Sequence, residues 1–245
     1  MRLCSLALLA VAIPAAAQPI ATDRPDFTES TSSVASGRLQ VEAGTTLARE
    51  PGVGTVWSGP EMLIRAGLGS GFEFRVVLPD LVAAAPFSPG ASGTLADALL
   101  GVKVELGRAA GLDAALIVDL ALDASGLYGS SPEPSAGLSP RALFVVGRDV
   151  GPVAVGVQAE ATFDRAAERV LAGATLVGGL GLSEHVGTFL EVAASAVPAG
   201  PAAVVLHSGV TLALSDALQL DVHGGAGLTR TAPDVFVGAG VGVRF

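Results

Sequence analysis

Residues 234–245 read D-V-F-V-G-A-G-V-G-V-R-F, and the fold is decided by this final stretch. Apolar side chains occupy every second position in it, at Val235, Val237, Ala239, Val241, Val243 and Phe245. The positions between them hold three glycines, one phenylalanine and one arginine. Successive side chains of a strand point to opposite faces, so a period of two predicts a strand with unlike faces. Because the chain ends on an aromatic residue of the apolar face, we expect this strand to close a barrel.

Segments of about ten residues with the same alternation precede the closing strand, which is typical of membrane-spanning β-strands. They lie at residues 38–47, 61–66, 72–78, 97–106, 112–120, 141–147, 153–163, 170–180, 186–195, 204–214 and 218–228. In the first five segments, all the charges of a given segment fall on one face. The pattern predicts an all-β protein, a transmembrane antiparallel up-and-down β-barrel of about twelve strands.

The connections between these segments alternate in length. Short ones at 69–71, 107–111, 181–185 and 215–217 are interleaved with long ones, notably 79–95 and 123–137. Tight turns on one rim and long loops on the other are typical of outer-membrane barrels. With an even strand count, both termini are predicted on the short-turn rim, which would face the periplasm.

The N-terminal residues divide into two parts ahead of the barrel. Residues 1–17 carry one positive charge, an apolar run and three consecutive alanines at 15–17, which is the layout of a secretory signal peptide. Residues 18–37 are polar and have no period, so we expect a coil-like lead-in before a barrel at 38–245. The single cysteine, Cys4, falls in the signal segment, so a mature chain would have no disulfide.

Composition excludes some partners. Without Arg2, 13 basic residues remain against 23 acidic ones, a net charge near −10, which argues against a nucleic-acid partner. Mean hydropathy is +0.59, yet no clean apolar run is long enough for a membrane helix. A soluble lipocalin-like barrel would show the same period with its apolar face inside. In each segment, the alternate positions that carry the charged residues form what we call the polar phase. These positions are rich in Gly, Ala and Thr and poor in Lys, which favours the membrane barrel.

Two stretches resemble a known family. They are A-T-D-R-P-D-F-T-E-S at 21–30 followed by G-R-L-Q-V-E-A-G at 37–44, and the last hairpin at 214–245. Both are similar to the bacterial family described as "putative MetA-pathway of phenol degradation", as are M-L-I-R-A-G-L at 62–68 and Glu191. The resemblance implies a Gram-negative outer-membrane protein that takes up hydrophobic or aromatic compounds. This chain departs from the family in having few Tyr and Trp.

Charged and histidine positions of the polar phase are the candidates for lining a lumen. They are Glu42, Arg65, Glu73, Arg75, Lys103, Glu105, Asp113, Asp119, Glu160, Glu191, His207, Asp221, His223 and Arg244. These side chains either line a solute path or only neutralise one another inside a narrow barrel. Their mixed signs predict weak ion selectivity.

The lead-in supplies four further candidates. Asp23, Arg24, Asp26 and Glu29 either fold into the lumen as a plug, pairing with residues such as Arg65 and Arg75, or belong to a disordered periplasmic tether. The two readings stay open on the sequence alone.

The sequence indicates no catalytic, metal-binding or nucleotide-binding site. His207 and His223 fall on the polar phase of neighbouring segments near Asp221, but no third metal ligand is evident. Ser208 points away from His207, there is no G-x-S-x-G motif, and glycines at 224–227 and 238–242 lack the strand-turn-helix context of a dinucleotide site. We predict no catalytic residue, metal or cofactor.

The strand pattern together with the family resemblance predicts passive transport through an outer-membrane barrel, and the resemblance implies that the solutes are small and hydrophobic or aromatic. The alternative is a closed barrel with a structural or partner-binding role, because Ile117, Leu143 and Phe236 also fall on the polar phase. Expected partners are outer-membrane lipid, the barrel assembly machinery, which would recognise Phe245 as an assembly signal, and a small solute whose identity the sequence leaves open.

Overall fold

The computed structural model describes residues 20–85, 92–122, 138–165 and 168–245. Its strands are β1 (Leu39–Glu50), β2 (Gly54–Gly59), β3 (Leu63–Gly69), β4 (Phe72–Val77), β5 (Leu81–Ala84), β6 (Ser92–Leu95), β7 (Ala98–Ala109), β8 (Leu112–Leu122), β9 (Ser139–Val150), β10 (Val153–Asp164), β11 (Arg169–Gly181), β12 (Val186–Ala196), β13 (Ala203–Ser215), β14 (Leu218–Gly227) and β15 (Val235–Arg244). In the described part of the chain, no helix is long and apolar enough to cross a membrane.

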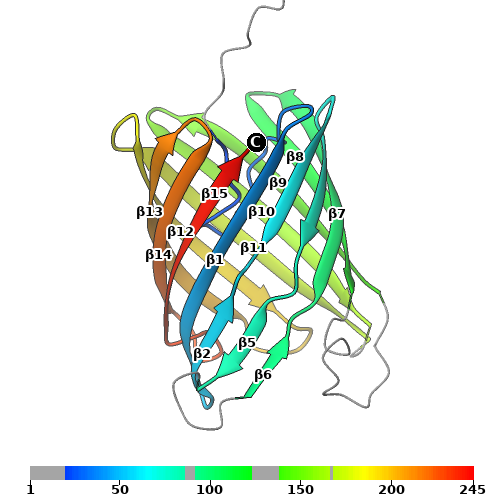
Figure 1. The fold of residues 1–245 in the computed structure, drawn as a ribbon. Helices are drawn as coiled ribbons and strands as arrows, with labels where there is room; N and C mark the ends of the chain where they lie inside the picture. The colour runs from blue at the N-terminus through cyan, green and yellow to red at the C-terminus, as the bar shows by residue number, and fades with distance from the viewer. Residues whose placement is uncertain (1–19, 86–91, 123–137, 166–167) are drawn as a thin grey trace, which may run out of the picture.

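The strands form one closed antiparallel barrel (Figure 1). Its order is β15-β14-β13-β12-β11-β10-β9-β8-β7-β4-β3-β1, and β1 pairs again with β15. The closing seam runs from Gln40 opposite Arg244 to Arg49 opposite Val235. The backbone of Phe245 extends this seam, since its N–H donates to Leu39 O at 2.7 Å. The predicted transmembrane barrel of about twelve strands, closed by the last strand, is confirmed.

Three wall strands are interrupted at the same level, so that β2 and β3, β4 and β5, and β6 and β7 are each two halves of one strand. Pro60 and Pro79 lie in two of the interruptions, where a residue without an N–H cannot continue the ladder. Single backbone bonds keep the wall joined there, including Gly44 N to Pro60 O at 2.8 Å.

The interruptions correct one prediction. The segment spacing predicts a long loop at 79–95, but β5 and β6 lie within that range and pair with each other. Both are only four residues long and flanked by irregular chain, so their alternation is too short to stand out in the sequence. The expected long connection at 123–137 lies outside the described residues.

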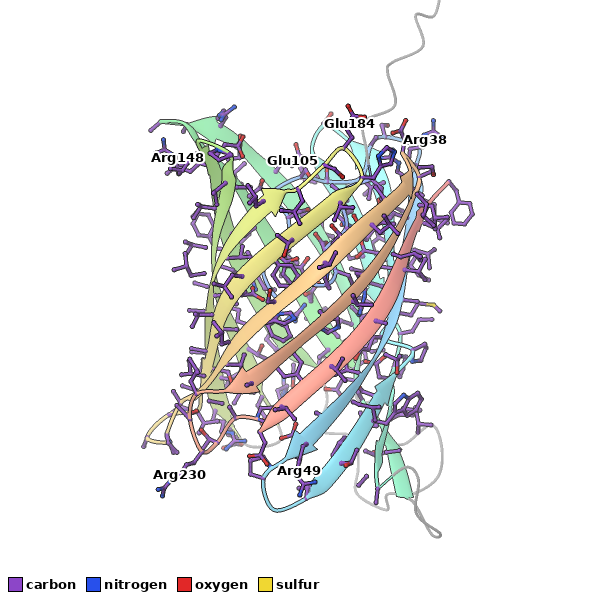
Figure 2. All side chains as sticks on the ribbon, turned by 90° about the vertical axis from the view of Figure 1, so that its left-hand side faces the viewer. Arg38, Arg49, Glu105, Arg148, Glu184 and Arg230 are labelled. Atoms are coloured by element: carbon purple, nitrogen blue, oxygen red, sulfur yellow. The ribbon has the colours of Figure 1, made fainter. Side chains whose placement is uncertain are left out.

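The barrel is inverted in polarity relative to a soluble protein. In β12, Leu190 points outward and is 56% exposed, whereas the next residue, Glu191, points inward and is 1% exposed. Figure 2 shows apolar side chains projecting from the outer surface between two charged rims, one near Arg148 and Glu184, the other near Arg49 and Arg230. Exposed large apolar residues and buried charges are the arrangement that lipid selects for.

The two rims differ. The short turns at 70–71, 110–111, 151–152, 182–185 and 216–217 share one rim with the C-terminus, and we call it the terminus rim (Figure 1). The connections at 51–53, 197–202 and 228–234 lie on the opposite rim, called the loop rim. Short turns therefore gather beside the C-terminus, as the segment spacing predicts.

Candidate functional site

The lead-in, described for residues 20–37, lies inside the barrel and contains no strand. In Figure 1 it is the blue coil seen within the terminus-rim half. Ile20 and Val34 in it are buried, and the N–H of Gly37 donates to Gly67 O at 2.9 Å just before β1 begins. The lead-in is therefore packed against the inner wall of the barrel.

A buried ion cluster joins the lead-in to four strands. Its members are Asp23, Glu29, Glu42, Arg65, Glu73, Arg75 and Lys103.

Asp23 lies at the centre of this cluster. Its Oδ2 accepts a hydrogen bond from Arg75 Nη1 at 2.5 Å and lies 3.2 Å from Arg65 Nη1. Its Oδ1 lies 3.1 Å from Lys103 Nζ, so one carboxylate serves three cations. Arg65 also donates from Nε to Glu73 Oε1 at 2.8 Å. Leaving any of these charges unpaired in the interior would be costly.

Glu42 and Arg24 fix the backbone of the lead-in beside β1. The Oε2 atom of Glu42 accepts the N–H groups of Asp23 and Arg24, both at 2.9 Å. The Arg24 guanidinium extends away from the cluster, with Nη1 2.7 Å from Glu61 Oε2 and Nη2 3.4 Å from Asp221 Oδ1. Both the main chain and the side chain of this segment are held by wall residues.

The lead-in also binds the opposite wall. Phe27 N donates to Glu191 Oε2 at 2.9 Å, and Thr28 Oγ1 donates to Glu191 Oε1 at 2.6 Å. The side-chain amide of Gln158 bridges two lead-in residues, accepting from Glu29 N at 2.9 Å and donating to Phe27 O at 3.2 Å. Residues 27–29 are thus attached to β10 and β12 while Asp23 and Glu29 are attached to β4 and β7.

The two histidines of the sequence analysis are neighbours. His207 Nδ1 lies 2.9 Å from Glu191 Oε2, and His207 Nε2 lies 3.0 Å from His223 Nδ1. The Phe27 ring packs on His207 with centroids 4.5 Å apart. Among the described residues, no group of three or more His, Cys, Asp or Glu side chains is arranged to hold a metal ion. The histidines support the lead-in through Glu191 and ring packing.

Burial and charge act in opposite directions on the lead-in carboxylates. Burial by itself would raise the pKa of Asp23, but Arg65, Lys103 and Arg75 outweigh it and hold that pKa well below its usual range. For Glu29, burial exceeds the opposing pull of Arg75 and raises the pKa to about 7. Asp23 is therefore the fixed charge of the cluster, and Glu29 titrates near neutrality.

Two cavities flank the lead-in. The larger, about 670 Å³, is lined by Phe27, Glu29, Phe236, alanine and valine side chains of β11 to β13, and polar side chains that include Gln158 and Glu160 of β10. The smaller, about 290 Å³, is lined by Asp26, other residues of 22–32 and the terminus-rim ends of β9 to β11. The lead-in therefore separates two hollow regions of the lumen.

The remaining predicted lumen residues are spread along the barrel. Glu160 lines the larger cavity and Asp113 the smaller one. Asp119 is buried and pairs with Arg141 at 2.7 Å. Glu105 accepts hydrogen bonds from Ser33 near the terminus rim.

Arg244 lies at the terminus rim. Its Nη2 donates to Asp216 O at 2.8 Å, in the turn between β13 and β14.

Several residues that bind the lead-in were absent from the sequence-based candidates. Gln40, Gln158, Thr175 and Gln219 contact it through uncharged side chains, and Arg141 completes the pair with Asp119. Each of the five lies on the polar phase of its strand. A search of that phase for amides and hydroxyls would have found the four uncharged residues, and Arg141 is a charge of the same phase that the candidates omitted.

Comparison with known proteins agrees with this architecture. A solved structure titled the COG4313 outer membrane channel from Pseudomonas putida F1 is similar, with a TM-score of 0.61 and 12% identity over 92% of this chain and all of that one. The KdgM porin has a TM-score of 0.58 with 9% identity, covering 84% of this chain and 99% of its own. The NanC porin has a TM-score of 0.57 with 6% identity, covering 84% and 98%. At these identities the likeness establishes the fold.

None of the curated proteins matches the sequence. The model of one family matches residues 22–245, which includes residues 22–37 of the lead-in and all the strands. The chain therefore belongs to the family described as "Putative MetA-pathway of phenol degradation".

Proposed function

We propose that the protein is a channel of the Gram-negative outer membrane through which small, mainly apolar or aromatic solutes pass without an energy source. The observation that carries the proposal is the cavity of about 670 Å³ between the lead-in and the loop rim. Most of the exposed surface of its wall is apolar and comes from alanine and valine side chains, Leu143 and the rings of Phe27 and Phe236, although about half of the lining residues are polar or charged. A wall whose exposed surface is mainly apolar and is interrupted by polar groups is typical of sites for small organic ligands.

The fold supports the same proposal, because the similar solved structures include proteins titled as porins and as an outer membrane channel. No catalytic residue is invoked, since passive passage needs none. Export by a signal peptide at residues 1–17 belongs to the proposal as well, and these residues lie outside the described part of the chain.

Liposome swelling tests the channel. Liposomes with the purified protein should swell faster in a small aromatic solute such as benzyl alcohol than in a sugar of similar size, with protein-free liposomes giving the rate at which the aromatic crosses lipid unaided. Equal rates with and without protein for both solutes would contradict transport.

A closed structural barrel is the second candidate. The observation that favours it is the attachment of the lead-in to opposite walls, through the ion cluster on one side and through Glu191 and Gln158 on the other. Absence of swelling with either solute, from a correctly folded barrel, would select this candidate.

Phe245 is proposed as the signal for assembly into the outer membrane. Its side chain is 63% exposed at the end of the closing seam, so it is free to be recognised. Replacing Phe245 with Asp should leave export intact and reduce the heat-modifiable barrel recovered from the outer membrane by about tenfold, a loss equivalent to roughly 1.4 kcal/mol of recognition. Phe163→Asp, an exposed aromatic in β10, is the control for general loss of apolar surface. Equal losses from the two variants would contradict a terminal signal.

A further inference from the structure

Glu29 occupies a position that no other described residue shares. It is the one residue that lines both the larger and the smaller cavity. Gln158 holds its backbone N–H at 2.9 Å, and its Oε2 lies 2.7 Å from Arg75 Nη2 and 3.9 Å from Lys103 Nζ. Glu29 therefore lies where the two cavities border each other.

The ion cluster presents its negative side to the cavities. Its cations Arg65, Arg75 and Lys103 have side chains that are 1%, 3% and 0% exposed, whereas the Glu29 side chain is 15% exposed. None of the three cations lines either cavity. The solute space is therefore in contact with a carboxylate, and the positive charges lie behind it.

The charge count of the cluster gives Glu29 a second role. Asp23, Glu29, Glu42 and Glu73 are four carboxylates against three cations, so ionised Glu29 leaves one negative charge in excess. When Glu29 is protonated, the cluster is neutral. The net charge at the junction of the cavities depends on this one residue.

Most other charged residues on the cavity walls are also acidic. The larger cavity has Glu50 and Glu160, which form no ion pair with any described residue, while its Arg141 is paired with Asp119 and its Glu61 with Arg24.

In the smaller cavity, Asp113 and Asp149 accompany Arg148. Burial, reinforced by the charge of Glu191, raises the pKa of Asp26 and favours its neutral form. Acidic and basic residues are mixed along the sequence, but in the folded barrel the charged residues that line the cavities are mainly carboxylates.

We propose that Glu29 sets the charge preference of the passage, so that small neutral or positively charged apolar solutes, such as aromatic amines, pass in preference to aromatic carboxylates. The proposal rests on the channel function proposed above. A charge at a narrow, poorly hydrated position acts strongly on ions that pass it, because screening by water is weak there. The preference predicted here differs from the weak selectivity that the mixed signs suggest.

Planar-bilayer recording of the full mature protein at pH 8 tests the proposal. That pH lies above the pKa of Glu29, whose surroundings include Arg75, Lys103, Asp23 and Asp26. In a KCl gradient, the reversal potential should have the sign of cation preference. It should keep that sign with benzyltrimethylammonium chloride in place of KCl, since the aromatic cation is expected to permeate.

Glu29→Gln should lower the cation-to-anion permeability ratio by about threefold or more, because the glutamine keeps the hydrogen-bonding shape without the charge. Glu184→Gln, in an exposed turn of the terminus rim that lines neither cavity, should leave the ratio unchanged. Glu160→Gln, which lines the larger cavity, should give a smaller decrease and provides a second test if Glu29→Gln fails to fold.

The outcomes are distinguishable. A wild-type channel that prefers anions, or a ratio unaffected by both Glu29→Gln and Glu160→Gln, would overturn the inference while leaving the channel in place. A folded wild-type barrel that conducts no ion and admits no solute would overturn the proposed function itself.

Discussion

Asp23→Asn is expected to lower the free energy of unfolding by about 3 kcal/mol or more, the range seen when one partner of a buried ion pair is removed. The asparagine keeps the shape of the side chain, but it supplies no charge to Arg75, Arg65 and Lys103, which all lie within 3.2 Å of the carboxylate. Equilibrium unfolding in urea, with the protein in lipid vesicles, measures the change.

The matched control is Asp234→Asn. Asp234 pairs with Arg49 at 3.8 Å, and both side chains are more than half exposed, so its loss should have little effect. Equal stability of the Asp23 and Asp234 variants would show that the ion cluster does not stabilise the barrel.

The contribution of Asp23 also has a defined pH dependence. Its pKa is lowered in the folded protein, so the stabilisation is present at neutral pH and is lost as the pH falls through the folded-state pKa, below the usual aspartate range. The difference in stability between wild type and Asp23→Asn should therefore persist from pH 7 to pH 5.

Deleting residues 22–30 is expected to raise single-channel conductance several-fold. These residues supply Asp23, Phe27 and Glu29, and they lie between cavities of about 670 and 290 Å³, which would merge without them. Arg65 and Arg75 would keep their ion pairs with Glu73, and Lys103, which loses Asp23 and Glu29, would be hydrated because water would enter the lumen. The barrel should remain closed, since the seam between β1 and β15 involves none of the deleted residues.

Removal of residues 199–201, in the connection between β12 and β13, is the control for a general effect of shortening the chain. These residues line neither cavity, so conductance should not change. Heat-modifiable migration on a gel establishes that both deletion variants fold. A folded 22–30 deletion with the conductance of the wild type would rule out a plug.

The fold could be predicted because contact with lipid requires a regular alternation of apolar and polar side chains along each strand. Every strand must present apolar side chains to the outside, so charges within a strand are confined to one parity, as in Glu73 and Arg75 of β4. The predicted segments missed β2, which lies between the segments at 38–47 and 61–66, and the range that contains β5 and β6. There Pro79 and two strands of four residues give too few alternations to separate a wall from a loop.

The parity of a strand also placed most candidate residues on the inner face, but it could not predict their partners. The contacts of Asp23 with Arg65, Arg75 and Lys103 join residues 42 to 80 positions apart. They depend on strand register and on the path of a segment that has no periodicity of its own. Whether the lead-in enters the barrel is likewise a property of the closed structure, because its polar composition fits a lumen and a solvated tether equally well.

The closing strand illustrates the division between sequence and structure. Its alternation by itself determined that residues 235–245 form a strand with an apolar face and that the strand belongs to a barrel wall. Only the tertiary structure explains why glycine occupies the other face of this strand. A Cβ at Gly238 would overlap His223, one at Gly240 would overlap Arg24, and one at Gly242 would overlap Thr22. The glycines make room for the lead-in and its neighbour His223, because the inner wall and a segment some two hundred residues earlier in the chain are in direct contact.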